Sequence, residues 1–196
     1  MSSASTWPPE RSSRQAAGQP PPAGPIHAAV LVPLFVDAST GEPHAVFTRR
    51  RTDLRRHAGE ISFPGGRRDP EDASLADTAL REAEEEIGLE RTAVRMLGEL
   101  PATSTFATNY LIHPFVGMIA AGHRWRASPR EVDAVLELPL RALEESRTRT
   151  RMERRGISFE TDAYILGEHL IWGATARILE HLLERLDSLM PAPGID

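Results

Sequence analysis

Residues 75–89 read Leu-Ala-Asp-Thr-Ala-Leu-Arg-Glu-Ala-Glu-Glu-Glu-Ile-Gly-Leu, and this segment is the strongest indication of the fold in the chain. Its apolar residues recur at helical spacing, which predicts an amphipathic helix over Leu75–Ile87. Gly88 comes next, and glycine is the residue that most readily ends a helix in the left-handed conformation. The helix therefore presents one apolar face to a core and one strongly acidic face elsewhere.

Three glutamates of this helix, Glu82, Glu85 and Glu86, stand three and four positions apart and project from one arc of about 100°. Like charges at this spacing repel by about 0.2–0.5 kcal/mol per pair on an isolated helix, and a divalent cation removes that cost. Ligands that are all oxygen select hard cations, which indicates Mg²⁺ or Mn²⁺. The helix alone leaves a solvated acidic face as the alternative, because glutamate is a good helix former.

The residues before the helix favour the metal site. Strands are predicted over Ile26–Val36, 44–50 and 59–63, and the last ends at Pro64-Gly65-Gly66, before a polar loop at 67–74. A turn without side chains lets backbone groups approach a metal or a phosphate. Arg81 stands beside the glutamates, where it can orient or neutralise a carboxylate.

The rest of the chain predicts a mixed arrangement of strands and helices. Further strands are expected over 92–97, 111–119, 131–138 and 157–165, with a Pro139 turn and short helix to about Glu145 and a long helix over 170–189. This order implies one α/β or α+β domain. We expect the domain to span 25–189, between a disordered tail at 1–24 and a short tail at 190–196.

Composition excludes several classes of protein. The net charge of −5 argues against a chain that coats nucleic acid or an anionic membrane. The chain has no cysteine, which excludes a disulfide framework, a thiolate zinc site and a cysteine nucleophile, and which suits the cytoplasm. No apolar run approaches the roughly 20 residues of a membrane span.

The nine residues from Arg81 to Leu89 resemble the second half of the Nudix box, Arg-Glu-aliphatic-x-Glu-Glu-x-Gly-aliphatic, at every fixed position. The first half departs from the pattern. Gly66 lies one position further from Arg81 than in the usual box, so the place of the loop glutamate falls on Asp72 or Ala73. We interpret the difference as a one-residue insertion in the loop.

The resemblance implies an α/β/α sandwich with a mixed central sheet and a catalytic loop-helix-loop, which hydrolyses a nucleoside diphosphate linked to another moiety. By match, Glu82 and Glu86 would be the principal ligands of Mg²⁺ or Mn²⁺. Glu85 would be a further ligand or would deprotonate water. Gly66 would lend a backbone carbonyl, and Arg81 would orient the glutamates.

The arginine-rich segment before the box resembles a second signature, that of the Nudix subgroup that hydrolyses coenzyme A. It is carried by Thr48, Arg50, Arg55, Gly59 and Phe63-Pro64-Gly65-Gly66, with Arg51 where the subgroup has Ser or Ala. Arginine offers bidentate geometry to phosphate. The predicted substrate-binding residues are Arg50, Arg55, His57, Gly65 and Gly66.

The alternative interpretation of the same segment is a basic strand edge that faces solvent, to which Arg49, Arg51 and Arg56 are assigned. Strand alternation places Thr48 and Arg50 on one face, and Arg49 and Arg51 on the other.

Later stretches also resemble the coenzyme A subgroup, so the resemblance extends from about residue 26 to residue 183. His113 is assigned a structural role, and Trp172 is expected in the core on the last helix. Glu160 or Glu168 could supply a late metal ligand or base, as in some relatives.

The leading hypothesis is a coenzyme A diphosphatase, in which water attacks the diphosphate to give 4′-phosphopantetheine and adenosine 3′,5′-bisphosphate. The first alternative is a Nudix hydrolase of ADP-ribose, a dinucleotide or a damaged nucleotide. The second is a non-catalytic nucleotide-binding module, which would be expected to lose the box glutamates. The expected partner is a small molecule, with neither nucleic acid nor membrane, and a homodimer is left open.

Overall fold

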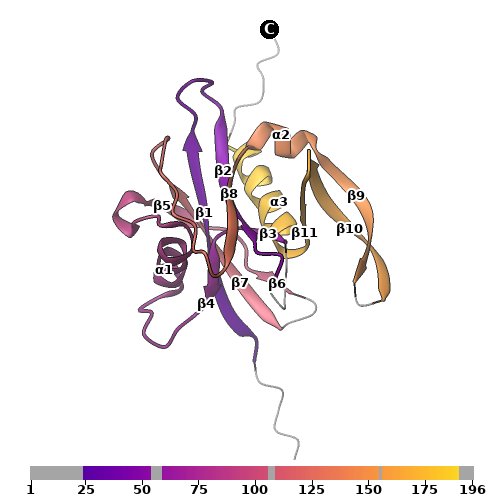
Figure 1. Cartoon of the computed structure of the whole chain (residues 1–196), viewed down its shortest axis with the longest axis horizontal. Coiled ribbons are helices and arrows are strands. Elements are labelled where there is room, and N and C mark those ends of the chain that lie inside the picture. The colour runs from indigo at the N-terminus through magenta and orange to yellow at the C-terminus, as the bar shows by residue number, and fades with distance from the viewer. Residues whose placement is uncertain (1–23, 54–58, 106–108, 155, 190–196) are drawn as a thin grey trace, which may run out of the picture.

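The computed structural model describes residues 24–53, 59–105, 109–154 and 156–189 (Figure 1). Of the sequence predictions, both tails apart from Gly24 lie outside the described residues, and so do Arg55, Arg56 and His57.

A mixed sheet forms the centre of the molecule around β1 (Ile26–Val36). β1 pairs in parallel with β7 (Tyr110–Met118) and antiparallel with β2 (Pro43–Arg50). β5 (Arg95–Glu99) lies outside β7. Four further strands complete the sheet by pairing with β2, β1, β7 and β2 respectively: β3 (Ile61–Ser62), β4 (Gly65–Arg67), β6 (Thr103–Ser104) and β8 (Val132–Pro139).

A second sheet follows in the chain. Its order is β11-β10-β9, from β9 (Arg147–Arg154), β10 (Ile157–Leu166) and β11 (His169–Trp172). The β9–β10 hairpin extends away from the central sheet, on the side where α3 (Gly173–Asp187) lies (Figure 1).

Helices cover both faces of the central sheet, because the side chains of β1 alternate between two apolar clusters. Leu31 and Phe35 pack with α1 (Leu75–Ile87), whereas Val32 and Leu34 pack with α2 (Leu140–Glu145) and α3. Figure 1 shows α1 and α3 on opposite sides of β1. The predicted α/β/α arrangement with a mixed sheet is confirmed. None of the helices in the described part of the chain is both long and apolar enough to cross a membrane.

Helix α1 has the predicted bounds because both ends are capped by their own sequence. The Ser74 Oγ accepts a hydrogen bond of 3.1 Å from the Asp77 N–H, which satisfies an otherwise free donor of the first turn. Gly88 ends the helix with a φ of 71°, and a Cβ there would lie 2.9 Å from the Cβ of Arg126. The two caps fix where α1 begins and ends, and thereby the position of its glutamates relative to the sheet.

Two sequence predictions about the strands were wrong, and strand β9 was not predicted. The segment 92–97 begins as a 3₁₀ turn, Arg91–Ala93, before β5. Gly65 and Gly66, expected in a turn, form strand β4 against β1. β9 was missed because its sequence, Arg-Thr-Arg-Thr-Arg-Met-Glu-Arg, has no alternation of apolar residues and is held by pairing with β10.

The last helix begins later than expected. Residues 169–172 form β11, and α3 starts at Gly173, whose φ of 66° turns the chain out of the strand. Trp172 therefore ends a strand and is half-buried, so its predicted place in the core of the last helix was wrong.

Candidate active site

The three glutamates of α1 differ strongly in exposure. The side chain of Glu86 is 6% exposed and that of Glu82 is 17% exposed, whereas that of Glu85 is 60% exposed. This order follows from the helix, because Glu86 lies nearest the apolar face that packs on the sheet. One buried, one half-buried and one exposed carboxylate thus share one side of α1.

Strand β4 brings its two glycines directly against these carboxylates. The Gly65 N–H donates a 3.2 Å hydrogen bond to Glu86 Oε2. A Cβ built on Gly66 would lie 2.4 Å from the Glu82 Oε1. Gly66 is therefore needed for space, and it lets the Glu82 carboxylate lie against the backbone of the sheet.

Arg81 connects the helix to the preceding loop. Its Nε and Nη2 donate to the two carboxylate oxygens of Asp72 at 2.9 and 3.1 Å, and its Nη1 donates to Glu82 Oε1 at 2.9 Å. A longer contact of 3.4 Å joins Nη1 to Glu85. The structure thus places Arg81 where it can orient both Glu82 and Glu85, as the sequence match implies for its role.

Asp72 is one of the two residues, with Ala73, to which the sequence assigned the position of the loop glutamate of the box. It is 8% exposed, and it also accepts from the Thr78 hydroxyl at 2.8 Å and the Asp69 N–H at 2.9 Å. The hydrogen bonds from Arg81 hold the pKa of Asp72 far below its usual range. Asp72 acts on the site through Arg81, since it fixes the guanidinium that contacts Glu82.

Arg50 lies on the side of β2 that faces α1, and thus on the face opposite Arg49, as strand alternation predicts. Its Nη1 is 3.7 Å from Glu86 Oε1, and its Nη2 is 3.6 Å from Glu131 Oε2. The Arg50 Nε is buried and has no hydrogen-bond partner among the described residues. A guanidinium with an unused donor beside the carboxylates is suited to contact an anionic substrate.

Glu131 is a site residue that the sequence reasoning missed. It stands directly before β8, where the pairing of Arg50 with Val132 brings it beside Arg50. Its charge acts on both Glu82 and Glu86. The only signal for it was a predicted strand at 131–138, and no local pattern shows which strand this segment pairs with.

Burial makes the carboxylates costly to ionise. Desolvation raises the pKa of Glu86 to about 8, against the Gly65 N–H and Arg50, which lower it. Burial also raises the pKa of Glu82, against the lowering effect of Arg81. A positive ion bound beside these carboxylates would therefore lower the cost of ionising them.

The donors fit a hard cation by chemistry. Glu82, Glu86 and Glu131 offer only carboxylate oxygens, which suit Mg²⁺ or Mn²⁺. Within the ranges that the structure describes, no three Asp, Glu or His side chains converge closely enough to hold an ion as they stand. To bind an ion together, the carboxylates of Glu82 and Glu86 would have to turn toward each other. Because Gly66 has no side chain, no Cβ blocks the Glu82 carboxylate on the side of β4.

The metal-free protein is expected to lose stability as the pH rises from about 4.5 to about 8. The folded state raises the pKa of Glu86 from 4.5 to about 8. The part of the free energy of unfolding that depends on Glu86 is therefore largest below the unfolded pKa, and it is lost as the pH rises through the folded pKa. Urea unfolding in chelator should show a loss of roughly 2–4 kcal/mol for the wild type between pH 4.5 and 8. Most of this loss should be absent in Glu86→Gln, with a smaller part remaining from Glu82. Parallel pH curves for the two proteins would contradict the assignment.

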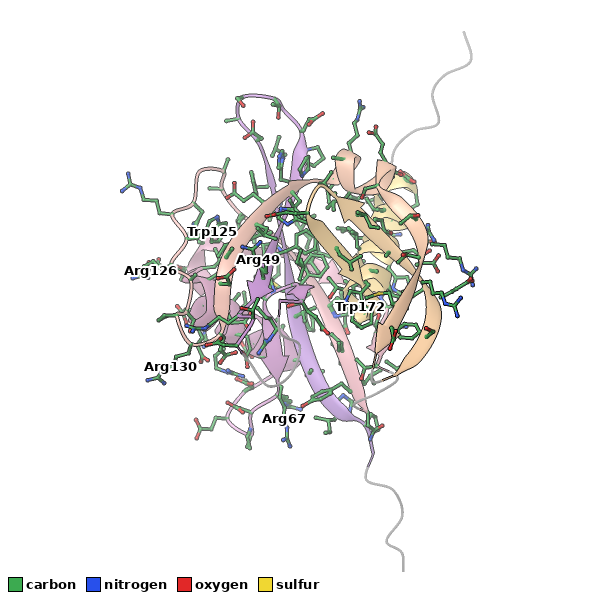
Figure 2. The ribbon with its side chains drawn as sticks, turned by 45° about the vertical axis from the view of Figure 1, so that its right-hand side comes forward. Arg49, Arg67, Trp125, Arg126, Arg130 and Trp172 are labelled. Atoms are coloured by element: carbon green, nitrogen blue, oxygen red, sulfur yellow. The ribbon has the colours of Figure 1, made fainter. Side chains whose placement is uncertain are left out.

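Other predicted residues lie away from the carboxylates. Arg49 points to the opposite face, where it pairs with Asp133 at 2.9 Å and Glu168 at 3.4 Å. Arg49 and Trp172 both line a pocket on that face (Figure 2). Glu160 pairs with Arg149 on the second sheet. Neither Glu160 nor Glu168 therefore joins the α1 glutamates.

His113 is not an isolated histidine. Its Nδ1 lies 3.0 Å from Glu99 Oε1, and its Nε2 lies 3.2 Å from Nδ1 of His27. This polar chain links β1, β7 and β5, which agrees with a structural role in the sheet.

Comparisons with known proteins agree with the fold and the box. A family model described as the NUDIX domain matches residues 25–157. The chain is 40% identical over 162 residues to the "Uncharacterized Nudix hydrolase NudL" of Photorhabdus laumondii, covering 82% of this chain and 84% of that protein. It is 38% identical over 161 residues to the protein of the same name from Yersinia pestis, covering 81% and 79%.

Solved structures are similar at lower identity. The Nudix hydrolase RenU from M. smegmatis has a TM-score of 0.59 at 14% identity, over 88% of this chain and 91% of that chain. The NUDIX domain of Shewanella oneidensis NrtR, solved with ADP ribose, has a TM-score of 0.54 at 14% identity, over 84% and 90%. At such identity these likenesses concern the fold alone.

Proposed function

Because the chain belongs to the NUDIX domain family, we propose that it hydrolyses the diphosphate of coenzyme A or its derivatives to 4′-phosphopantetheine and adenosine 3′,5′-bisphosphate. The observation that carries the proposal is the position of Arg50. This residue belongs to the segment that resembles the coenzyme A subgroup, and it lies 3.7 Å from the buried carboxylate of Glu86. A residue of the substrate signature thus adjoins the box glutamates.

The chemistry that a Mg²⁺ or Mn²⁺ ion would supply here is neutralisation of charge on the phosphoryl oxygens and activation of water. Glu82, Glu86 and the Gly66 carbonyl would hold the ion. Arg81 would keep Glu82 in place, and the more exposed Glu85 would serve as a further ligand or accept the proton of the attacking water.

Two further groups complete the proposed chemistry. Arg50 would form an ion pair with the diphosphate, and its ion pair with Glu86 would break as it does so. Glu131, which pairs with the other end of the Arg50 guanidinium, would guide that movement. Arg55 and His57, which lie outside the described residues, and the backbone of Gly65 remain proposed substrate contacts.

The proposal extends to the organisation of the protein. We place the activity in one domain over 25–189, in the cytoplasm, with a small-molecule substrate and with neither nucleic acid nor membrane as partner. The proposal is compatible with a homodimer.

A substrate panel tests the activity. Coenzyme A and ADP-ribose are incubated with the protein, with Mg²⁺ and with chelator, and the products are identified by mass. We expect 4′-phosphopantetheine and adenosine 3′,5′-bisphosphate, formed only with the cation. Faster release of AMP from ADP-ribose would transfer the assignment to that substrate, and no product from either would favour the non-catalytic module.

Arg55→Ala tests the choice of substrate within the family. We expect it to lower kcat/KM about tenfold more for coenzyme A than for dephospho-coenzyme A, because only the former carries the 3′-phosphate that an arginine can bind. Arg56→Ala, a neighbouring arginine assigned to solvent, is the matched control. Equal losses on both substrates would remove the argument for coenzyme A recognition by Arg55.

A further inference from the structure

A second pocket lies between the β9–β10 hairpin and the start of α3, with a volume of about 150 Å³. α3 covers the face of the central sheet opposite α1, so this pocket is separate from the carboxylate site. Its walls carry Arg147 and Arg149 from β9 and Tyr164 from β10. It is a site to which the proposed reaction gives no role.

Tyr164 is the least exposed residue of the pocket lining. Its side chain is among the most buried in the molecule at 1% exposed, yet its hydroxyl has no hydrogen-bond partner within the described part of the chain. Arg147, Glu180 and Asp162 act electrostatically on the hydroxyl, and these three residues line the pocket together with Tyr164. Burial raises the pKa of Tyr164 to about 12, and the group therefore remains a hydrogen-bond donor near neutral pH. A buried donor without a partner is costly, and a ligand that accepts from it removes the cost.

The first turn of α3 adds backbone donors at the same place. The helix runs for 15 residues from Gly173, and the side chain of its N-cap residue, Trp172, does not cap the N–H groups of the first turn. The free N–H groups and the helix dipole favour an anion there. A Cβ built on Gly173 would meet no atom within 4 Å, so the space beside this turn is open.

Arg147 and Arg149 bring positive charge to the pocket, whose lining also carries the carboxylates of Glu160, Asp162 and Glu180. Arg147 pairs with Glu180, and Arg149 lies 3.4 Å from Glu160. A guanidinium has five N–H donors, and one carboxylate uses only some of them. Donors from the hydroxyl, the helix turn and two arginines thus converge on a small volume.

We propose that this pocket binds a phosphate group, either as free phosphate or as the head of a phosphomonoester. A phosphate offers several acceptor oxygens, which match a hydroxyl donor, backbone N–H groups and arginine in one place. The volume admits a phosphate with a short substituent, and the remainder of a larger molecule would lie outside, along the hairpin.

Isothermal titration calorimetry of the full chain tests the site. Inorganic phosphate and glycerol 3-phosphate are titrated in chelator at constant ionic strength. We expect saturable binding that Tyr164→Phe weakens about tenfold, the size expected for one hydrogen bond to a charged ligand. Removing an unpartnered oxygen should leave the fold and Tm of this variant unchanged or improved. Tighter binding of one probe than of the other identifies the free or the esterified phosphate as the ligand.

Two variants give controls. Tyr110→Phe makes the same change in the other tyrosine of the chain, and Arg50→Ala alters the carboxylate site, so both should bind phosphate as the wild type does. Absence of saturable binding, equal affinity in Tyr164→Phe and wild type, or loss of binding in Arg50→Ala would overturn the proposal. If Tyr164→Phe does not fold, Arg149→Gln serves instead, because that side chain is 70% exposed, and unchanged affinity in it would overturn the proposal as well.

Discussion

Replacing Glu86 with glutamine is expected to lower kcat for the proposed hydrolysis by on the order of 10³-fold, the scale that follows when a cation stabilising several kcal/mol of transition-state charge is lost. Glutamine has the length of glutamate, and its amide oxygen can still accept from the Gly65 N–H. It has no negative charge to hold a cation. Steady-state kinetics with saturating Mg²⁺ measure the loss, and circular dichroism shows that the fold persists.

Glu84→Gln is the matched control on the same helix. Glu84 is an exposed residue that pairs with Arg91 at 3.0 Å, so its replacement should change kcat less than about twofold. Full activity of Glu86→Gln under Mg²⁺ would show that the metal assignment is wrong.

Gly66→Ala is expected to lower kcat on the order of 10²-fold. The new methyl group would lie 2.4 Å from Glu82 Cδ, so the carboxylate must move by an ångström or so. Misplacement of a catalytic group by about 1 Å costs about that factor in rate. Crowding in a packed region should also lower the free energy of unfolding by about 1–3 kcal/mol, which urea titration measures.

Gly24→Ala provides the comparison for this variant. A Cβ at Gly24 would meet no atom within 4 Å, so its rate and stability should equal those of the wild type. A Gly66→Ala protein with the kcat and Mg²⁺ dependence of the wild type would mean that the position of Glu82 against β4 is unimportant for the reaction.

Local patterns predicted the helix and its glutamates because everything that defines them is close in sequence. Apolar spacing, the Ser74 cap and Gly88 determine α1 without reference to the rest of the chain. Strand alternation is equally local, but it predicts only that Arg50 lies on the face opposite Arg49, and the packing of the sheet decides which face adjoins α1. The order of burial along Glu82, Glu85 and Glu86 followed from the same helical geometry.

The missed features depend on partners that no local pattern identifies. Glu131 adjoins Arg50 only because β8 pairs with β2, and Asp72 is recognised as the partner of Arg81 only once the loop is folded. β9 has a polar sequence, and it becomes a strand through its pairing with β10. The β2–β8 pairing joins segments far apart in the sequence, whereas the other two pairs are near in sequence but have no local pattern that identifies them.

The parallel pairing of β1 with β7 has a consequence for the order of folding. In the chain, these two central strands enclose β4, the Asp72 loop and α1. Contacts between such distant segments require a large loop to close before any gain in stability, which slows folding. During synthesis, β1 cannot complete its pairing with β7 until the chain has been made as far as Met118. Until then the glutamate helix can pack only on an incomplete sheet, and Glu82 and Glu86 take their final positions late.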